Sequence, residues 1–257
     1  MSHRIFGLIG NPLGHSFSAR FFNDFFKDNG IDAEYRNFEL HDIGELMEVI
    51  AEYPEIAGLN VTIPYKEQVI PYLASLDSLA SRIGAVNTIQ FSKRPLDGDD
   101  FTMKGYNTDV LGFMGSVRPF LSEEVRARKD ALVLGSGGVS KAICEGLRLL
   151  GFVPHTVSRT PADGQIGYRD VDAKTMSRVG VIANATPMGM WPHVEECPAI
   201  PYDALLPGTV CFDAVYNPER TLFLKRCAQY GGVMVGGLEM LHIQAREAWK
   251  IWGQTTG

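Results

Sequence analysis

The chain has 257 residues, of which 45% are hydrophobic, and it carries 24 basic and 30 acidic side chains. This length is sufficient to bury a substantial core and to form two domains of ordinary size. The formal net charge of -6 leaves no excess of positive charge to attract nucleic acid, so we expect no nucleic-acid partner.

Hydropathy and cysteine usage narrow the class of protein further. No apolar stretch approaches the ~18 residues that a membrane span needs, and the N-terminus lacks the basic start and apolar core of a signal peptide. The 4 cysteines are widely spaced without a C-x-x-C pair, which is typical of free thiols in a reducing compartment. The 6 histidines lack the spacing of metal ligands. We therefore expect a cytoplasmic protein with no membrane partner and no metal.

The first polar motif follows an apolar strand predicted over residues 5–9. Residues 10–18, Gly-Asn-Pro-Leu-Gly-His-Ser-Phe-Ser, place Ser16 and Ser18 at the start of a helix rich in phenylalanine. Free amides and the helix dipole at such a start favour an anion, so the two hydroxyls are candidates for binding one. A serine that only caps the helix is the competing interpretation, and both roles can hold because two serines are present.

Polar side chains appear next on a strand predicted over residues 58–63, where apolar and polar residues alternate as in a half-buried strand. Asn60 and Thr62 therefore share one face, and Lys66 follows directly after the strand. If this face lines a binding site, the three side chains suit a small polyhydroxylated or carboxylated ligand. A strand edge with a solvated lysine is the alternative.

Two Asn-Thr pairs follow, in residues 84–89 and 105–113, each after a glycine. Asn87 belongs to the first pair, and the carboxylate of Asp109 follows the second. Taken alone, Asp109 is typical of a helix cap. If it lay beside Lys66, the ammonium and carboxylate could transfer a proton to or from a substrate hydroxyl, which typically contributes about 10² to 10⁴ in rate.

A nucleotide-binding signal begins at residues 131–134, a continuous apolar strand that leads into a glycine turn and an amphipathic helix. Amides at the start of such a helix can cradle a pyrophosphate, and glycines let it approach closely. Ser140 stands where the third glycine of G-x-G-x-x-G is expected, so the motif is imperfect. The candidate cofactor residues in this turn are Gly135, Ser136, Gly137, Gly138 and Val139.

The next predicted strand, residues 155–158, ends about twenty residues after the glycines, where the adenosine ribose of a dinucleotide lies. NAD-binding proteins usually place an acid here and NADP-binding proteins an arginine, and this chain has Ser158, Arg159 and Thr160. Hydrogen bonds to a charged group are worth roughly 1.5 to 3 kcal/mol each, so Arg159 favours NADP. A surface arginine after a strand is the alternative. Residues 185–190 also follow an apolar strand, and we expect this loop to border the nicotinamide.

The final helix is predicted from about Leu238 to Trp252, with Gln244 on its apolar face. A glutamine on such a face needs a hydrogen-bond partner, and a substrate hydroxyl would serve. A backbone group at a seam between packed helices is the other interpretation.

Nine segments, taken in order, resemble the shikimate dehydrogenase family: GNPLGHSFS, GLNVTIPYKE, IGAVNTI, GYNTDVLGF, LGSGGVSKA, SRT, NATPMGM, DAVYNPERT and GLEMLHIQAREAW. The resemblance covers nearly the whole chain and implies two α/β domains that flank a cleft. The first, residues 1–104, would bind substrate, and the second, residues 105–237, would be a Rossmann-type NADP-binding domain. The last helix, residues 238–257, would pack back on the first domain. The implied activity is the reversible, NADPH-dependent reduction of 3-dehydroshikimate to shikimate in chorismate and aromatic amino-acid biosynthesis, by a monomer or homodimer.

The resemblance also implies a role for each matching residue. Lys66 and Asp109 would be the catalytic pair, with Lys66 donating a proton to the carbonyl oxygen as hydride reaches the carbon. Ser16 and Ser18, helped by Tyr216, would hold the substrate carboxylate. The ring hydroxyls would be bound by Asn60, Thr62, Asn87, Asp109 and Gln244. Beyond the glycine turn, the cofactor would be contacted by Ser158, Arg159, Thr160, Thr186, Met188 and Gly237.

The chain departs from the family pattern in two places. Ala19 replaces the usual proline and Phe22 a common histidine, which should alter the entry of the helix more than the serine hydroxyls. A second basic residue often follows the SRT segment, but here residues 161–163 are Pro-Ala-Asp, so the preference for NADP over NAD is expected to be weaker than usual. Two alternatives stay open: a quinate/shikimate dehydrogenase of broader specificity, and a nucleotide-responsive binding protein without turnover.

Overall fold

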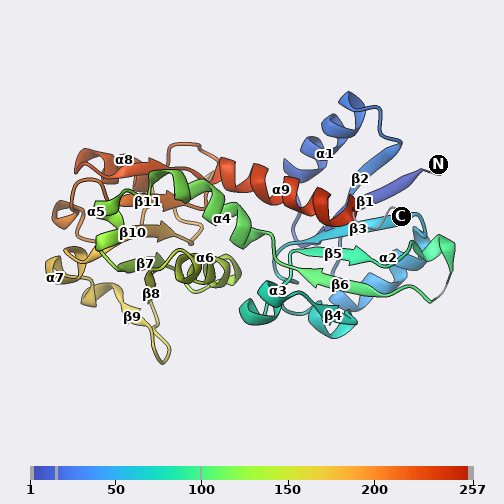
Figure 1. The fold of residues 1–257 in the computed structure, drawn as a ribbon, viewed down its shortest axis with the longest axis horizontal. Coiled ribbons are helices and arrows are strands. Elements are labelled where there is room, and N and C mark those ends of the chain that lie inside the picture. The colour runs from blue at the N-terminus through green and yellow to red at the C-terminus, as the bar shows by residue number, and fades with distance from the viewer. Residues whose placement is uncertain (1–2, 15–16, 99, 254–257) are drawn as a thin grey trace. The chain divides into compact units, whose positions relative to one another are not determined.

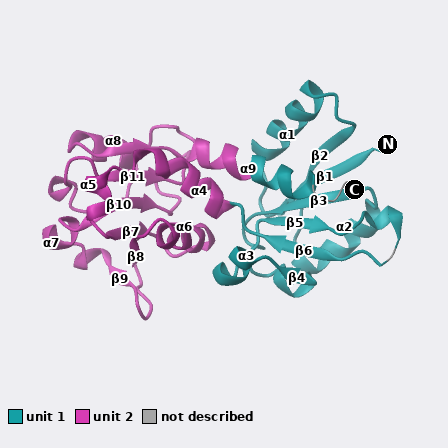
Figure 2. Ribbon diagram, in the orientation of Figure 1, with its two compact units in different colours: residues 1–108, 245–257 teal, residues 109–244 magenta. Residues whose placement is uncertain are grey.

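The computed structural model describes residues 3–14, 17–98 and 100–253 (Figure 1). The chain forms two compact units, which Figure 2 shows in different colours. Unit 1 comprises Met1–Thr108 and Ala245–Gly257, and unit 2 comprises Asp109–Gln244. The two junctions, after Thr108 and after Gln244, differ from the boundaries predicted after residues 104 and 237.

Unit 1 contains a six-stranded mixed sheet with the strand order β2-β1-β3-β5-β6-β4. Strand β1 pairs in parallel with β2 and β3, whereas β5 pairs antiparallel with both β3 and β6. The carboxyl ends of the parallel strands β1 and β3 therefore meet at one edge. The strands are β1 (Arg4–Gly10), β2 (Ala33–Glu39), β3 (Ile56–Val61), β4 (Ser75–Leu76), β5 (Thr88–Phe91) and β6 (Met103–Tyr106).

The prediction of a strand over residues 58–63 was partly wrong. Strand β3 ends at Val61, two residues earlier than expected, because the Tyr65 N–H donates to the Thr62 carbonyl at 2.9 Å and closes a turn. The strand is also buried on both faces rather than on one. Long-range packing causes this burial, which the local alternation of side chains could not indicate.

The helices of unit 1 are α1 (Phe17–Asp28), α2 (Leu46–Glu52) and α3 (Ser78–Ile83), and the last turns of α9 (Gly237–Gly253) join them from Ala245 onward. Trp252 of α9 is buried among aromatic side chains of α1 and β1. Its Nε1–H donates to the Ile89 carbonyl at 2.9 Å. Gly58 makes room for it, because a Cβ there would lie 2.3 Å from Trp252 Nε1. The end of the chain is therefore part of the core of unit 1.

Unit 2 is built on a six-stranded, wholly parallel sheet with the order β12-β11-β10-β7-β8-β9. The chain order reverses at β7, which lies between β8 and β10, and this is the strand order of a Rossmann fold. The predicted α/β class with a Rossmann-type second domain is thereby confirmed. The strands are β7 (Asp130–Leu134), β8 (Val153–Ser158), β9 (Ile166–Gly167), β10 (Val179–Asn184), β11 (Val210–Asp213) and β12 (Val233–Val235).

Helices cover both faces of the unit 2 sheet, and two apolar clusters fill the spaces beneath them. Every residue of β10 is buried, as expected for a central parallel strand. The helices are α4 (Asp109–Val117), α5 (Glu123–Ala127), α6 (Gly138–Leu149), α7 (Ala173–Met176) and α8 (Leu222–Gln229), together with the first turns of α9. None of the helices within the described residues has both the length and the apolar character needed to cross a membrane.

Candidate functional site

The predicted site residues divide between the two units. Ser18, Asn60, Thr62, Lys66 and Asn87 belong to unit 1, whereas Asp109, Gln244 and the predicted cofactor residues, together with Tyr216, belong to unit 2. Ser16 lies outside the described residues.

In unit 1, the segments that follow β1 and β3 lie side by side at the carboxyl edge of the sheet. The Thr62 N–H donates to the Ile9 carbonyl at 2.9 Å, and the Asn11 N–H donates to the Ile63 carbonyl at 3.0 Å. Gly10 allows this approach, since a Cβ there would lie 2.3 Å from Thr62 Cγ2. The fold thus brings the first serine motif next to the motif that contains Thr62 and Lys66.

Ser18 lies in the first turn of α1 and contacts a tyrosine that the sequence did not single out. Burial raises the pKa of the Tyr35 phenol well above its usual range, and a hydrogen bond from Ser18 opposes this effect. The phenol in turn donates to Asn60 Oδ1 at 2.8 Å. Tyr35 therefore connects α1 to the polar residue of β3.

Asn60 is only 5% exposed, and its amide is used within the protein. Its Nδ2 donates to the Asn87 carbonyl and to Thr88 Oγ1, both at 3.1 Å, while its Oδ1 accepts from Tyr35. These bonds use both N–H groups and leave one lone pair on the oxygen. Only as an acceptor could Asn60 contact a ligand without breaking these bonds.

Asn87 is held against the segment that precedes α4. Thr108 donates its N–H to Asn87 Oδ1 at 2.7 Å, and Asn87 Nδ2 donates to Thr108 Oγ1 at 3.0 Å. Nearby, Val86 donates its N–H to the Lys66 carbonyl at 2.7 Å, which brings the chain after β3 next to Asn87. Asp109 follows Thr108 as the first residue of α4 and is buried.

Asn107 is a further polar residue of this region, and it is not among the site residues predicted from the sequence. Its Nδ2 donates to the Ala85 carbonyl at 2.9 Å, and the side chain is 3% exposed. Within the described part of the chain, its buried Oδ1 has no hydrogen-bond partner. Such an acceptor is unusual in a folded protein and suits a bound water or a ligand hydroxyl. The only signal in the sequence was its place before Thr108 and Asp109.

In unit 2, the glycine turn lies at the point where the strand order reverses. Gly135 has φ +107°, and a Cβ there would lie 2.8 Å from Thr186 Cγ2, so the turn packs against the loop after β10. Gly137 caps α6 without a side-chain hydrogen bond, and at Gly137 and Gly138 a Cβ would meet nothing within 4 Å. The helix start is therefore open, with room for a phosphate close to its amides.

Ser140, the residue that interrupts the glycine fingerprint, is accommodated inside the helix. It is buried, and its hydroxyl donates to the Gly137 carbonyl at 2.7 Å. The departure from the motif therefore leaves the open space at Gly137 and Gly138 intact. These residues fit a dinucleotide.

The predicted ribose-binding segment adjoins the glycine turn. The Gly135 N–H donates to the Val157 carbonyl at 2.8 Å, and β8 ends at the next residue, Ser158. Ser158 Oγ accepts from the Thr160 N–H at 3.3 Å and donates to the Thr160 carbonyl at 3.2 Å, which forms a tight turn around the exposed Arg159. The guanidinium is thus presented to solvent at the strand end.

The loops after β10 and β11 carry further predicted ligand residues and meet at a buried acid. Asp213, at the end of β11, accepts hydrogen bonds from Thr221 Oγ1 at 2.5 Å and from Asn184 Nδ2 at 3.0 Å. Thr186 donates its hydroxyl to Asn184 Oδ1 at 2.6 Å. The signal for this network in the sequence is an acid at the end of a continuous apolar strand.

Tyr216, Gly237 and Gln244 complete the predicted set. Tyr216 is 40% exposed in the loop after β11. Gly237 packs on the same loop, because a Cβ there would lie 2.5 Å from the Ala214 carbonyl oxygen. Gln244 is buried, and its Nε2 donates to the Leu241 carbonyl at 3.2 Å. Its Cβ lies 3.3 Å from the position that a Cβ on Gly112 would take, so it sits at a seam between α4 and α9.

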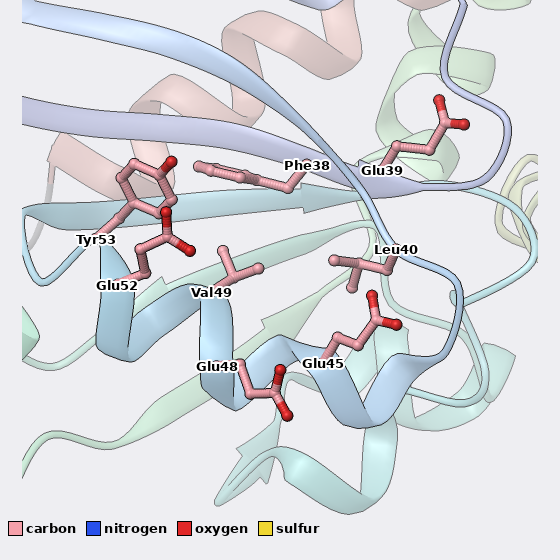
Figure 3. Close-up of a pocket in the computed structure, with 8 residues that line it drawn as sticks. All are labelled: Phe38, Glu39, Leu40, Glu45, Glu48, Val49, Glu52 and Tyr53. Carbon is pink, nitrogen blue, oxygen red and sulfur yellow. The ribbon is translucent and has the colours of Figure 1, made fainter.

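A hollow of about 310 Å³ in unit 1 lies apart from these residues, between β2 and α2 (Figure 3). Its glutamates would repel a carboxylate or a phosphate, so it is no site for the ligands considered above. It is lined by Phe38, Glu39, Leu40, Glu45, Glu48, Val49, Glu52 and Tyr53.

Comparison with known proteins identifies the family. Residues 8–89 match the model of the shikimate dehydrogenase substrate binding domain. A shikimate dehydrogenase (NADP(+)) from Halothermothrix orenii is 35% identical over 272 residues, which covers 98% of this chain and 91% of that protein. The chain belongs to the shikimate dehydrogenase family.

Two solved structures of the shikimate dehydrogenase family agree with the fold. Shikimate 5-dehydrogenase from Thermus thermophilus, in complex with NADP(H) and shikimate, has a TM-score of 0.81 and 26% identity, covering 98% of this chain and 94% of that one. The enzyme from Listeria monocytogenes, in complex with shikimate and NAD, has a TM-score of 0.83 and 27% identity, covering 98% and 92%. The residues that match the substrate binding domain of the family, 8–89, include Asn60, Thr62, Lys66 and Asn87.

Proposed function

We propose that this protein is a shikimate dehydrogenase that reversibly reduces 3-dehydroshikimate to shikimate with NADPH, in chorismate and aromatic amino-acid biosynthesis. The observation that carries the proposal is a family relationship over 98% of the chain. It is supported by a polar cluster in unit 1 and by an open glycine turn in a Rossmann unit. A binding protein without turnover would need neither Lys66 nor Asp109, and the chain retains both.

The polar residues of unit 1 suit the substrate chemically. We assign the substrate carboxylate to Ser18, in the first turn of α1, where helix amides favour an anion, and to Ser16, which lies outside the described residues. Hydroxyl groups of the ring would contact Thr62, Asn87 and the remaining lone pair of Asn60. Tyr216, Asp109 and Gln244 of unit 2 complete the proposed substrate set. The side-chain amides of Asn60 and Asn87 are held by buried hydrogen bonds, so they would contact the ring without first reorganising.

The proton chemistry is assigned to Lys66 and Asp109. NADPH, when bound, supplies the hydride that reduces the substrate ketone. Negative charge then grows on the ketone oxygen, so a cation there stabilises the transition state more than the bound substrate. Lys66 would donate the proton to this oxygen, and Asp109 would orient the ammonium group. In the direction of shikimate oxidation, the same pair would receive the hydroxyl proton.

The cofactor residues are those of unit 2. The open start of α6, with Gly135, Ser136, Gly137, Gly138 and Val139, would hold the pyrophosphate. Arg159 would bind the additional phosphate of NADP, within the turn formed by Ser158 and Thr160. The loop with Thr186 and Met188 would border the nicotinamide, and Gly237, at the start of α9, would also contact the cofactor. Residues 161–163 add no second basic side chain, so we expect NAD to serve as a weaker cofactor.

The decisive experiment follows the reduction of NADP and of NAD with shikimate and with quinate, at mildly alkaline pH. Rapid turnover of shikimate with NADP establishes the proposed function, and comparable rates with quinate indicate a quinate/shikimate dehydrogenase of broader specificity. No turnover by folded protein with any of the four pairs would contradict the proposal and favour a binding function.

We also propose that the enzyme acts in the reducing cytoplasm as a monomer or homodimer. All 4 cysteines are free, and Cys144, Cys211 and Cys227 are buried thiols inside unit 2, which suits a compartment without disulfide formation. Light scattering after size exclusion determines the oligomeric state, and cell fractionation determines the compartment.

A further inference from the structure

Strands β10 and β11 end on the same rung of the unit 2 sheet, where Asn184 and Asp213 are register partners. Beyond this rung the chain forms two loops. The loop after β10 carries Thr186 and Met188, and the loop after β11 carries Tyr216. Under the function proposed above these are ligand residues, so the last rung of the sheet determines where both ligand loops begin.

The Asp213 carboxylate joins the two loops and α8. The side chain is 0% exposed. Oδ1 accepts from Asn184 Nδ2 and from the Val215 N–H, both at 3.0 Å, and Oδ2 accepts from Thr221 Oγ1 at 2.5 Å. Thr221 also caps α8, where its Oγ1 accepts from the Leu224 N–H at 3.3 Å. One side chain therefore connects three segments of the chain.

From Asn184 the connection continues into the loop after β10. Asn184 Oδ1 accepts from the Thr186 N–H at 3.1 Å and from its hydroxyl at 2.6 Å. Thr186 Oγ1 then accepts from the Met188 N–H at 3.2 Å. Because Asn184 Nδ2 must face the Asp213 carboxylate, its Oδ1 faces Thr186, and the carboxylate thereby sets the orientation of the amide.

Position 213 requires an acid, because the side chain must present one acceptor oxygen to Asn184 and Val215 and a second acceptor oxygen to Thr221. Asparagine would present one oxygen and one NH₂ group, and the NH₂ would oppose one of the present donors. Within the described residues all the donors to Asp213 are uncharged, so no ion pair offsets the burial of its charge. Burial raises the pKa of Asp213 to about 6, while hydrogen bonds from Thr221, Val215 and Asn184 oppose the shift. A buried acid of this kind is unfavourable for stability alone.

We propose that Asp213 is a positioning residue that holds residues 185–190 and 214–218 in the arrangement that binds NADP and the substrate carboxylate. It acts through Asn184 and Val215 and contacts no ligand itself. The proposal rests on the function proposed above, but it can be tested through cofactor binding alone.

The first test compares Asp213→Asn with Asp203→Asn, the same chemical change at an exposed position of unit 2. NADP binding is measured by calorimetry, turnover by kcat and KM, and folding by thermal unfolding at pH 7. Asp213→Asn should bind NADP about tenfold more weakly and lower kcat/KM for shikimate by at least as much. Its unfolding midpoint should stay close to that of the wild type, because removal of the buried charge offsets the cost of the donor that the new amide opposes. Asp203→Asn should match the wild type throughout.

A loss of binding without a loss of stability is the result that a merely structural role would not produce. NADP affinity and kcat/KM within twofold of the wild type would overturn the proposal, as would a lower unfolding midpoint with unchanged affinity. Absence of shikimate turnover in the wild type would instead refute the proposed function, while direct NADP binding would still test Asp213.

Thr221 provides a second pair of variants if Asp213→Asn fails to fold. Thr221→Ser keeps the hydroxyl that donates to Asp213, and Thr221→Val replaces it with a methyl group of similar size. The valine variant should bind NADP several-fold more weakly than the serine variant. Equal affinities for the two variants would overturn the proposal.

Discussion

Asn87 and Thr108 are joined by hydrogen bonds in both directions: the Thr108 N–H donates to Asn87 Oδ1 at 2.7 Å, the Thr108 hydroxyl donates to the same oxygen at 3.2 Å, and Asn87 Nδ2 donates to Thr108 Oγ1 at 3.0 Å. The pair joins the end of unit 1 to the sheet that carries the proposed substrate residues, immediately before Asp109. Both side chains are buried, so each needs the other as a hydrogen-bond partner.

Asn87→Ala should therefore destabilise the protein as well as weaken substrate binding. Removing the amide leaves the buried N–H and hydroxyl of Thr108 without their present partner, which should lower the free energy of unfolding by about 1–3 kcal/mol. Urea unfolding measures this loss. Asn29→Ala, which removes an exposed side-chain hydrogen bond to the Phe25 carbonyl, serves as the control and should change stability little. Equal stability of the two variants would contradict the assignment.

Lys66→Ala should lower kcat far more than it raises KM for shikimate. The ammonium group is proposed to act where charge develops, so its loss should reduce kcat by about 10² to 10⁴. Steady-state kinetics of shikimate oxidation with NADP measures both constants. Lys129→Ala, at an exposed position, should leave them unchanged. Near-normal kcat in the Lys66 variant would remove this residue from the proton transfer.

Arg159→Ala should change the choice of cofactor rather than the chemistry. A lost hydrogen-bonded ion pair to the additional phosphate should raise KM for NADP about ten- to a hundredfold and leave KM for NAD almost constant. The ratio of kcat/KM for the two cofactors is the measurement. Arg169→Ala, which removes another exposed arginine of unit 2, is the control. An unchanged ratio would show that Arg159 does not read the phosphate.

Gly137→Ala should separate binding from folding. The backbone there has φ -76°, which alanine adopts readily, and its Cβ would meet no protein atom within 4 Å. The methyl group would, however, occupy the space proposed for the pyrophosphate. We expect an unchanged unfolding midpoint and about tenfold weaker NADP binding by calorimetry, with Gly253→Ala as the control at another open glycine. Unchanged affinity would place the phosphates elsewhere.

The raised pKa of Asp213 predicts a pH dependence of stability. Because its folded pKa of about 6 exceeds the ordinary value of 3.8, the folded state binds the proton more tightly than the unfolded state. The group therefore opposes folding at neutral pH, and its contribution becomes more favourable as the pH falls through about 6 toward 3.8. Between pH 7 and pH 5 the wild type should gain about 1 kcal/mol in unfolding free energy relative to Asp213→Asn.

Urea unfolding of the two proteins at pH 7, 6 and 5 tests this difference, in which other titrations cancel. Within the described residues, the thiol of Cys227 is the titratable group that interacts with the charge of Asp213. A hydrogen bond with Cys211, burial and the charge of Asp213 raise the pKa of Cys227, so it stays protonated throughout this interval. A constant difference between the proteins would show that Asp213 does not titrate there.

The sequence predicted what local patterns encode. Continuous apolar runs correctly predicted β7, before a glycine turn, and β10, before the loop of residues 185–190, because a parallel strand covered on both faces is usually apolar. The glycine turn was predicted in spite of Ser140, whose hydroxyl bonds within its own helix. Strand β3 was misjudged because its second face is covered by Trp252, almost two hundred residues later in the chain. No local period reports such a contact.

The hydrogen-bond networks could not be predicted from the sequence for a related reason. Tyr35, Asn60 and Asn87 come from three different segments, and which donor meets which acceptor is fixed only when the strands pair. Asp213 looked like one residue of a motif, although a charge at the end of an apolar strand already required an explanation. Its partners Asn184 and Thr221 emerge only from the register of β10 and β11 and from the cap of α8.

The burial of Trp252 against Gly58 and Phe6 has a consequence for the order of events during synthesis. The strands of unit 1 leave the ribosome before unit 2, but the aromatic cluster that covers them needs residues 245–253, which emerge after unit 2. All residues of unit 2 are available before those residues appear. Part of an apolar face of the unit 1 sheet therefore stays uncovered until residues 245–253 have been translated.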